Sequence, residues 1–369
     1  MATPASSPNP AGRPTLRVIA AKADLSLTAT SMALRNHPGI SAATRARVQA
    51  LARELGYHPD PKLASLMQHL RTQGGSEYRE TIAFLSPFDE YARWRAYSQH
   101  DYYMGAVDRA AELGYRVELF HLGSAGMTPQ RMSDLLKARG IRGLLVAGAE
   151  KPDGRLELEW SSFAAITFSY SLAWPDLHRA TTDYYREMIS TLARLRAEGC
   201  QRIGLHVKIA DDNKAFNFWR SAYLFHEDAI PAKDRIPMHT AHDDGATLPG
   251  WLKTHRPDAV ISAGCDLPRD YERAHGKSPP ARIRYVNMNI YHGDDRSRGI
   301  DQDSYSVGRL ACGHLVTLLQ RNEIGLPAQP QVISIEGRWV ENYPAWLRSL
   351  GKRTKPAIPR SNAKSASRK

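Results

Sequence analysis

Two kinds of hydrophobic pattern divide this chain. Over residues 15–56, apolar positions recur every three or four residues in three short stretches, which is the spacing of amphipathic helices. From residue 81 onward, short apolar runs alternate with longer amphipathic stretches. The first pattern predicts a compact block of three helices. The second predicts strands alternating with helices, which is typical of parallel sheets that carry helices on both faces.

The first block has the signals that begin and end short helices. The predicted helices span residues 16–23, 27–35 and 42–55. Thr15, Ser26 and Ser41 directly precede them, and each has a hydroxyl that can cap a helix N-terminus. Two helices joined by a tight turn and braced by a third predict a helix-turn-helix from Thr15 to Asn36, within a DNA-binding domain of residues 15–56. A plain bundle of three capped amphipathic helices is the alternative.

The longer second part predicts an α/β core over residues 80–351. Eight predicted strands exceed one small sheet, so we expect two doubly wound parallel-sheet subdomains. The predicted strands span residues 81–85, 116–120, 143–147, 164–168, 202–207, 259–263, 284–287 and 331–335. The predicted helices of the core span residues 103–113, 129–139, 185–198, 248–255 and 305–321.

Charge is concentrated at the two ends of the chain. The formal net charge is +12, of which residues 1–72 contribute +6 and residues 352–369 contribute +7, so the middle is near neutral. Basic ends suit a polyanion, because binding to phosphates releases condensed counterions. The tail at 352–369 also fits a purely solubilising role. We expect residues 1–14 and this tail to be disordered and residues 57–79 to form a hinge or linker.

Several kinds of chemistry find no support in the sequence. The three cysteines lie far apart and have no metal or redox spacing, and no apolar run is long enough to cross a membrane. His239 and His242 lie in a segment between Pro237 and Gly245, which predicts a loop rather than a metal-binding helix. We therefore expect a cytoplasmic protein that is not an enzyme and needs no cofactor or metal, and that has no membrane partner.

The helical block resembles the lactose-repressor (LacI/GalR) family of bacterial transcription factors. Segments 15–26, 27–39 and 41–59 carry the resemblance, which covers the helix-turn-helix, the third helix and the entry to the hinge. It continues more loosely through segments 139–146, 199–205, 256–261 and 299–303. It implies a core similar to periplasmic binding proteins, a homodimer, a pseudo-palindromic operator in double-stranded DNA and a small-molecule effector.

The resemblance also implies which residues of the head contact DNA. Base-reading positions of the second helix match Leu27, Thr28 and Met32. Leu and Met can contact thymine methyl groups but cannot donate to guanine, and packing inside the head is an alternative for both. Candidate phosphate contacts are Ser26, Thr30, Ser31, Asn36 and Arg45. Ser26 can also serve only as a helix cap.

The hinge begins at Tyr57, which joins the candidate DNA contacts. In the family this segment folds into a helix on the operator, and a leucine enters the minor groove. Leu66 best matches that leucine, and Leu63 is the second choice. An apolar wedge of this kind unstacks a base step and kinks the duplex. A plain linker with one amphipathic turn is the alternative.

The resemblance places an effector between the two subdomains, outside the strand ends. Candidate effector-binding residues are Ser86, Phe88, Tyr170, Asn213, Trp219, Asp266 and Asn289. A sugar or sugar derivative is the implied ligand class. The family's cleft arginine has no match, since Lys214 lies near its place and Arg220 comes later, so the sugar specificity stays open. Each candidate can instead have only a structural role.

The resemblance also implies that the chain crosses between subdomains three times, near residues 178–181, 300–303 and 326–330. The first subdomain then comprises residues 80–179 and 303–327, and the second comprises 180–302 and 328–351. The leading hypothesis is a dimeric repressor controlled by an effector. The alternative is a cytoplasmic small-molecule-binding protein whose N-terminal block does not contact DNA.

Overall fold

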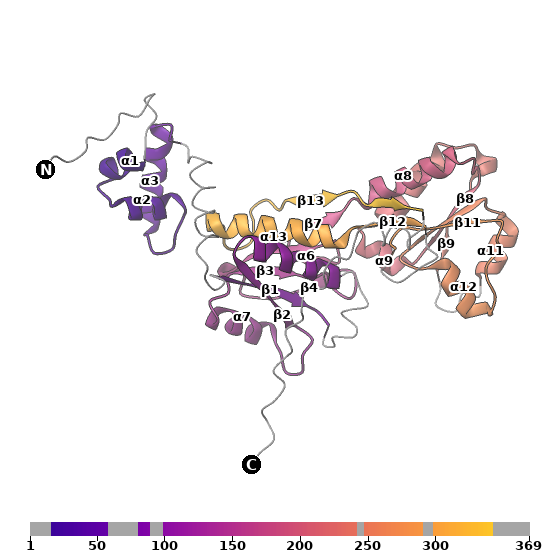
Figure 1. Cartoon of the computed structure of the whole chain (residues 1–369), viewed down its shortest axis with the longest axis horizontal. Helices are drawn as coiled ribbons and strands as arrows, with labels where there is room; N and C mark the ends of the chain where they lie inside the picture. The colour runs from indigo at the N-terminus through magenta and orange to yellow at the C-terminus, as the bar shows by residue number, and fades with distance from the viewer. Residues whose placement is uncertain (1–15, 58–79, 89–98, 242–246, 291–297, 342–369) are drawn as a thin grey trace, which may run out of the picture.

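The computed structural model describes residues 16–57, 80–88, 99–241, 247–290 and 298–341. A small helical head at the N-terminus precedes a larger core of two subdomains (Figure 1), and the Asn322 side chain of the core donates to the Asn36 carbonyl of the head. The head contains α1 (Leu16–Ala23), α2 (Leu27–Leu34) and α3 (Ala42–Glu54). All three predicted helices are confirmed, with ends that differ by at most one residue.

A small apolar core holds the head together. Ile19 of α1, Ala33 of α2 and Val48 of α3 are fully buried against one another. The turn between α1 and α2 passes through Asp24 at φ 51°, and the turn after α2 passes through Asn36 at φ 57°. Asp and Asn tolerate this left-handed conformation better than most residues, so both turns form without a glycine at these positions.

The first subdomain is built on a six-stranded parallel sheet. Its strand order is β13-β7-β5-β3-β1-β2. The strands are β1 (Glu80–Ser86), β2 (Tyr115–His121), β3 (Gly143–Val146), β5 (Ala164–Phe168), β7 (His178–Thr182) and β13 (Val332–Ile335). Helices α6 (Gln99–Glu112) and α13 (Ser304–Arg321) pack on one face, and α7 (Pro129–Ala138) packs on the other. A short pair, β4 (Gly154–Arg155) and β6 (Leu172–Trp174), lies beside this sheet.

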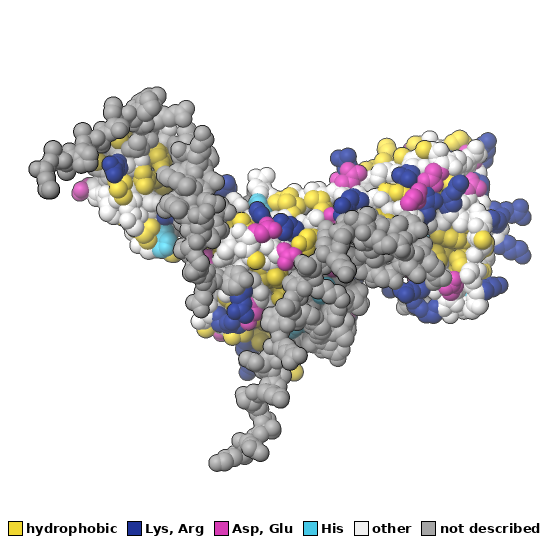
Figure 2. Space-filling model, viewed as in Figure 1, with side chains coloured by type: hydrophobic (Ala, Val, Ile, Leu, Met, Phe, Trp, Pro, Cys, Tyr) yellow, Lys and Arg dark blue, Asp and Glu magenta, His cyan; other side chains and the backbone are white. Residues whose placement is uncertain are grey.

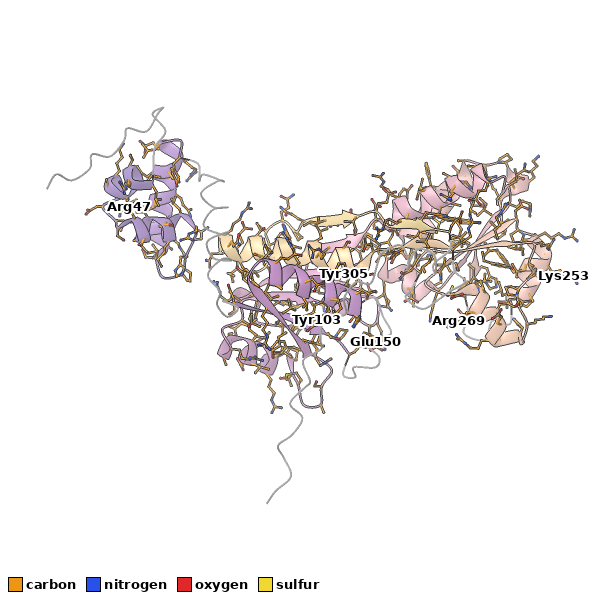
Figure 3. The ribbon with its side chains drawn as sticks, viewed as in Figure 1. Arg47, Tyr103, Glu150, Lys253, Arg269 and Tyr305 are labelled. Carbon is orange, nitrogen blue, oxygen red and sulfur yellow. The ribbon has the colours of Figure 1, made fainter. Side chains whose placement is uncertain are left out.

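Helices α6 and α13 cross at two glycines. A Cβ at Gly105 would lie 1.9 Å from the carbonyl oxygen of Tyr305, and a Cβ at Gly308 would lie 2.0 Å from that of Tyr102. Any side chain at either position would therefore push the helices apart. Figure 3 shows Tyr103 and Tyr305 on these two neighbouring helices.

The second subdomain contains another six-stranded sheet, of order β14-β12-β11-β10-β8-β9, in which only β14 runs antiparallel to its neighbour. The strands are β8 (Ile203–Val207), β9 (His239–Thr240), β10 (Ala259–Ala263), β11 (Arg284–Asn287), β12 (Gly299–Asp301) and β14 (Arg338–Val340). Its helices are α8 (Tyr184–Ala197), α9 (Ile209–Lys214), α10 (Phe218–Asp228), α11 (Leu248–His255) and α12 (Leu267–His275). The two doubly wound subdomains predicted from the sequence are confirmed.

The first and third crossings between subdomains differ from those expected, whereas the second lies within the expected residues 300–303. Strands β7 and β13 pair with each other in the first sheet, whereas we placed their residues mainly in the second subdomain. The chain therefore crosses after residue 182, at residues 302–303 and at residues 336–337. The third crossing lies furthest from its predicted place, because β13 follows the end of α13 and stays in the same sheet.

None of the helices in the described ranges is long and apolar enough to cross a bilayer. Figure 2 shows Lys and Arg side chains at the outer end of the second subdomain, where Figure 3 labels Lys253 of α11.

Candidate DNA-binding face and effector cavity

Helix α2 exposes an apolar side chain at its first position. Ser26 caps the helix, and its hydroxyl oxygen accepts a hydrogen bond of 3.1 Å from the Ala29 amide. Leu27 follows with 44% of its surface exposed, and Thr28 is exposed beside it. Leu27 therefore does not pack into the core of the head, and that alternative is wrong for the described head.

Not every candidate on α2 is accessible. Thr30 is fully buried, and its hydroxyl donates to the carbonyl of Ser26 at 2.9 Å. A phosphate contact by Thr30 is therefore contradicted, because its side chain serves the first turn of the helix. Ser31 and Met32 are half-buried, one turn beyond the N-terminal end.

Two further candidates are fixed by hydrogen bonds after α2. The Arg45 guanidinium donates to the Asn36 carbonyl at 3.0 Å, and the Gln49 side chain donates to the Asn36 side-chain oxygen at 2.6 Å. Tyr57 is half-buried and packs against the head's core. Leu66 lies outside the described residues. The exposed residues at the start of α2 are Ser26, Leu27 and Thr28, while Asn36 is exposed and Arg45 half-buried beyond its other end.

A cavity of about 330 Å³ lies between the two subdomains of the core. Residues that follow β1, β3, β5, β8 and β10 line it, so it lies at the carboxyl ends of strands from both sheets. Glu150, labelled in Figure 3, marks the side of the first subdomain that faces the second. The aromatic residues that line the cavity are Phe88, Tyr102, Phe168, Tyr184 and Trp219. Its polar lining includes Gln99, Glu150, Ser169, Ser171, Lys208, Asp211, Lys214, Asn289 and Gln302.

Three of the seven predicted effector residues line this cavity. They are Phe88, Trp219 and Asn289. Ser86 is fully buried at the end of β1, where its hydroxyl oxygen accepts from the Phe88 amide at 3.3 Å. It therefore shapes the chain below the cavity without lining it.

The other three predicted residues have structural roles, so their expected place in the cavity is contradicted. Tyr170 lies beneath the Arg179 guanidinium, 4.9 Å from the ring centre. Asn213 is exposed and accepts from Arg220 at 3.1 Å. Asp266 caps α12 by accepting from the Arg269 amide at 3.2 Å.

Arg220 does not replace the missing cleft arginine. Its guanidinium donates to the fully buried carboxylate of Asp212. Lys214 lines the cavity instead, and its ammonium group lies 3.1 Å from the Asp211 carboxylate. A Cβ at Gly264 would lie 2.5 Å from that of Asp211, so glycine lets α9 approach the end of β10.

An aromatic pair that the sequence analysis missed forms one wall. The Tyr102 ring stacks on the Phe168 ring, with centres 4.6 Å apart and planes 7° from parallel. Phe168 ends a predicted strand, so the rule that ligands bind at strand ends could have identified it. Tyr102 offers no such signal, because it lies within a helix.

Tyr184 also lines the cavity. Burial raises the pKa of its phenol well above the usual value, so the group stays neutral. Its hydroxyl lies 2.8 Å from the Ser169 hydroxyl, with which it forms a hydrogen bond.

Two buried polar atoms in the lining lack a partner among the described residues. The Gln99 side chain donates to the Gly148 carbonyl at 3.0 Å, but its own oxygen accepts nothing. The indole N–H of Trp219 is also unpaired. Buried polar groups are nearly always hydrogen-bonded in folded proteins. The lining thus offers one acceptor and one donor to a bound molecule.

Potential metal ligands do not cluster in the described ranges. No group of three or more potential His, Cys, Asp or Glu ligands converges within them. His239 lies in β9 rather than in the predicted loop, and its Nδ1 lies 2.8 Å from Nδ1 of His206 in the same sheet. His242 lies outside the described residues.

The comparisons with known proteins agree with this architecture. Residues 15–60 match the family described as bacterial regulatory proteins, lacI family. An HTH-type transcriptional regulator of Mycobacterium tuberculosis is 31% identical over 153 residues, which are 41% of this chain and 40% of that relative. The match thus spans less than half of that curated relative's length.

Solved structures resemble the chain over nearly its whole length. The transcriptional regulator CelR in complex with cellobiose has a TM-score of 0.54 at 18% identity, over 89% of this chain and 99% of that one. The lac repressor dimer bound to operator and the anti-inducer ONPF has a TM-score of 0.51 at 16% identity, over 90% and 98%. A lacI-family regulator CCPA from Weissella paramesenteroides with bound glucose has a TM-score of 0.52 at 13% identity, over 71% and 97%.

These structures share the fold, and the family match supplies the identity of the head. The match coincides with the described helices α1 to α3, and the core has the two-sheet arrangement of the solved regulators. Residues 15–60 are therefore similar to bacterial regulatory proteins of the lacI family, and the core shares the fold of the solved regulators.

Proposed function

We propose that the chain is a dimeric repressor that binds a pseudo-palindromic operator in double-stranded DNA under the control of a small molecule held between its subdomains. The observation that carries this proposal is the exposed start of α2. Ser26 satisfies the helix end, while Leu27 and Thr28 are left on the surface. The relative solved as the lac repressor dimer is itself bound to an operator.

Leu27 and Thr28 read the bases in this proposal. The second helix of a helix-turn-helix lies in the major groove with its N-terminal residues at the base edges. Leu27 packs against a thymine methyl group, and the Thr28 hydroxyl bonds a base edge or a phosphate. Ser31 and Met32, half-buried one turn later, make the next contacts.

The remaining head residues position the protein on the backbone. Ser26 lies at the start of α2, and Asn36 and Arg45 lie beyond its other end, where they hold each other by a hydrogen bond. Contacts to phosphate fix register and orientation but carry no sequence information. Tyr57 starts the hinge, and Leu66 beyond it enters the minor groove as a wedge.

A dimer lets the protein bind both half-sites of the operator at once, which raises its affinity and sets its register on the DNA. Two heads related by a two-fold axis match two half-sites on opposite sides of a pseudo-palindrome. The expected separation of the half-sites is about one helical turn, or a multiple of it.

The cavity suits a hydroxylated ligand with an apolar face. Trp219 and the stacked pair of Tyr102 and Phe168 offer flat apolar surfaces. The unpaired Gln99 oxygen can accept from a hydroxyl, and the unpaired Trp219 N–H can donate to one. A sugar or sugar derivative has both features, and the solved relatives carry cellobiose and glucose.

The test for DNA binding is selection of duplexes from a random pool by the full-length protein. We expect a pseudo-palindrome to be enriched, and its affinity to fall steeply as salt rises, because phosphate contacts release counterions. A variant with Leu27→Ala and Thr28→Ala should lose the enrichment while keeping weak general binding. Absence of any binding at low salt would overturn the proposal.

The effector is tested by thermal unfolding of the full-length protein with a panel of mono- and disaccharides. A ligand that binds only the folded state raises its midpoint by mass action. Gln99→Leu removes the unpaired acceptor and should abolish the shift, whereas the exposed Gln130→Leu should retain it. An equal shift in both variants would exclude Gln99 from the site.

A further inference from the structure

One buried carboxyl group joins all three crossings between the subdomains. Glu187 lies in the first turn of α8 and is fully buried. Its carboxyl accepts from the Thr182 hydroxyl, from the Gly337 amide at 2.9 Å and from the Gln302 side chain at 3.4 Å. Thr182 ends β7, and Gln302 and Gly337 lie in the second and third crossings. A single side chain therefore connects the three segments about which the subdomains would move.

The third crossing fits this carboxyl closely. A Cβ at Gly337 would lie 2.6 Å from Oε1 of Glu187 and 2.8 Å from the Asp301 carbonyl oxygen. Only glycine allows the backbone of the third crossing to approach the carboxyl and the second crossing together. The hydrogen bond from the Gly337 amide depends on this close approach.

Gln302 connects the carboxyl to the cavity. The residue is buried, donates to Oε2 of Glu187 and also lines the cavity between the subdomains. A change in the hydrogen bonding of Glu187 is therefore transmitted by one amide group to the surface on which an effector would lie.

We propose that Glu187 is a positioning residue that links proton uptake to the crossings and to the cavity. An ionised carboxylate only accepts, so it can hold all three donors at once. Protonation on Oε2 turns this atom into a donor that faces the Gln302 N–H group. The amide must then turn its oxygen toward Glu187, which presents the amide nitrogen to the cavity and weakens the hold on the crossings. The regulatory consequence rests on the function proposed above.

The surroundings of Glu187 make protonation accessible near neutral pH. Burial raises the pKa of its carboxyl to about 7, and the three hydrogen bonds lower it by less. Within the described part of the chain, it has no cationic partner. The charged and titratable groups of the elements around it are Asp183, which caps α8, then Tyr184, Tyr185, Arg186, Arg194 and Arg196 on α8, His178 and Arg179 on β7, Asp301 and Asp303 at the second crossing, and Glu336 and Arg338 at the third. Arg186 pairs with Glu336 at 3.2 Å. Arg338 pairs with Asp303 at 2.8 Å instead.

Hydrogen exchange of the full-length protein, without DNA or ligand, tests the proposal. The readout is the protection factor of the Gly337 amide from pH 5.5 to 8.5, corrected for the intrinsic exchange rate at each pH. In a local opening that leaves Glu187 buried, a charged acceptor makes a stronger hydrogen bond than a neutral one. We therefore expect protection of Gly337, taken relative to amides that exchange only by global unfolding, to rise about fivefold across this range. Glu187→Gln should give a flat profile, because the amide carries no charge.

Glu227→Gln is the matched control. Glu227 is a partly buried carboxyl of the same subdomain whose pKa is also raised by burial, and it accepts from the Ile236 amide away from the crossings. This variant should keep the wild-type profile at Gly337. A flat wild-type profile, or a Glu187→Gln profile that still rises, overturns the proposal. If Glu187→Gln does not fold, the wild-type profile decides. DNA binding is measured in a separate experiment. Failure of the repressor proposal would therefore leave both exchange profiles unchanged.

Discussion

Leu27 is an exposed apolar residue at the position expected to read bases. Leu27→Ala should weaken binding to the selected operator by about 1 kcal/mol, or roughly fivefold, because a contact with a thymine methyl group is lost. The midpoint of thermal unfolding should change little, since the side chain is 44% exposed. Titrations on the operator and on a version with that thymine replaced by uracil, which lacks the methyl group, measure the effect. An equal loss on both duplexes would argue against the methyl contact.

The hinge leucine is predicted from the sequence resemblance. Leu66→Ala should lower affinity for the operator while leaving non-specific binding largely intact, because the wedge acts only where the duplex is kinked. Binding to operator and to random-sequence DNA at matched salt measures this difference. Leu63→Ala is the control, and a larger effect there would move the wedge to residue 63.

At the residue scale, caps were predictable and cavity residues were only partly so. Ser26 was predictable as a cap because capping depends on residues within one turn. Asp266 was wrongly expected in the cavity because it follows β10. Its carboxylate caps α12 instead. Gln99 and Tyr102 reach the cavity only because α6 packs on the first sheet, and that packing has no signature in the adjacent sequence.

The crossing of α6 and α13 allows a prediction at the scale of elements. Gly308→Ala places a methyl group against the Tyr102 carbonyl and should lower the free energy of unfolding by about 1–3 kcal/mol, as overpacking does. Gly313→Ala on the same helix is the control. Its Cβ would contact only Arg109, at 3.6 Å, so the gain in helix propensity should stabilise the protein by up to about 1 kcal/mol. Chemical unfolding of both variants checks the sign, and equal destabilisation would contradict the close crossing.

Apolar elements were predicted more accurately than polar or very short strands. Strand β5, which is buried throughout, and helix α11 were predicted with their observed ends. Strand β7 was expected to be a crossing from the resemblance, yet His178 and Arg179 are buried and bonded within the first subdomain. Strands β12 and β14 have three residues each, too few to show a period.

For the whole molecule, Glu187 predicts how stability depends on pH. Its pKa is about 7 in the folded chain against 4.5 for the ordinary side chain, so between these values the folded state binds a proton that the unfolded state has lost. Raising the pH from 4.5 to 7 therefore removes stability, by up to about 3 kcal/mol. Glu187→Gln should be more stable relative to wild type at pH 8 than at pH 5. Chemical unfolding at both values measures this, and a constant difference would contradict it.

The match of residues 15–60 to the lacI family favours a regulator over a binding protein that does not contact DNA. The sequence predicted this class through its resemblance over these residues, where helix caps and turns are local. It did not predict the third crossing, which depends on the long-range pairing of β13 with β7.

The three crossings also determine the order in which the protein can fold as it is synthesised. The head is one continuous segment, so it can fold as soon as it leaves the ribosome. The first sheet cannot be completed until α13 and β13 have been made, because Val307, Ala311 and Leu315 fill its core. A nascent chain therefore carries a finished head while a large apolar sheet face still awaits its helix. During that interval, chaperones have an exposed surface to protect.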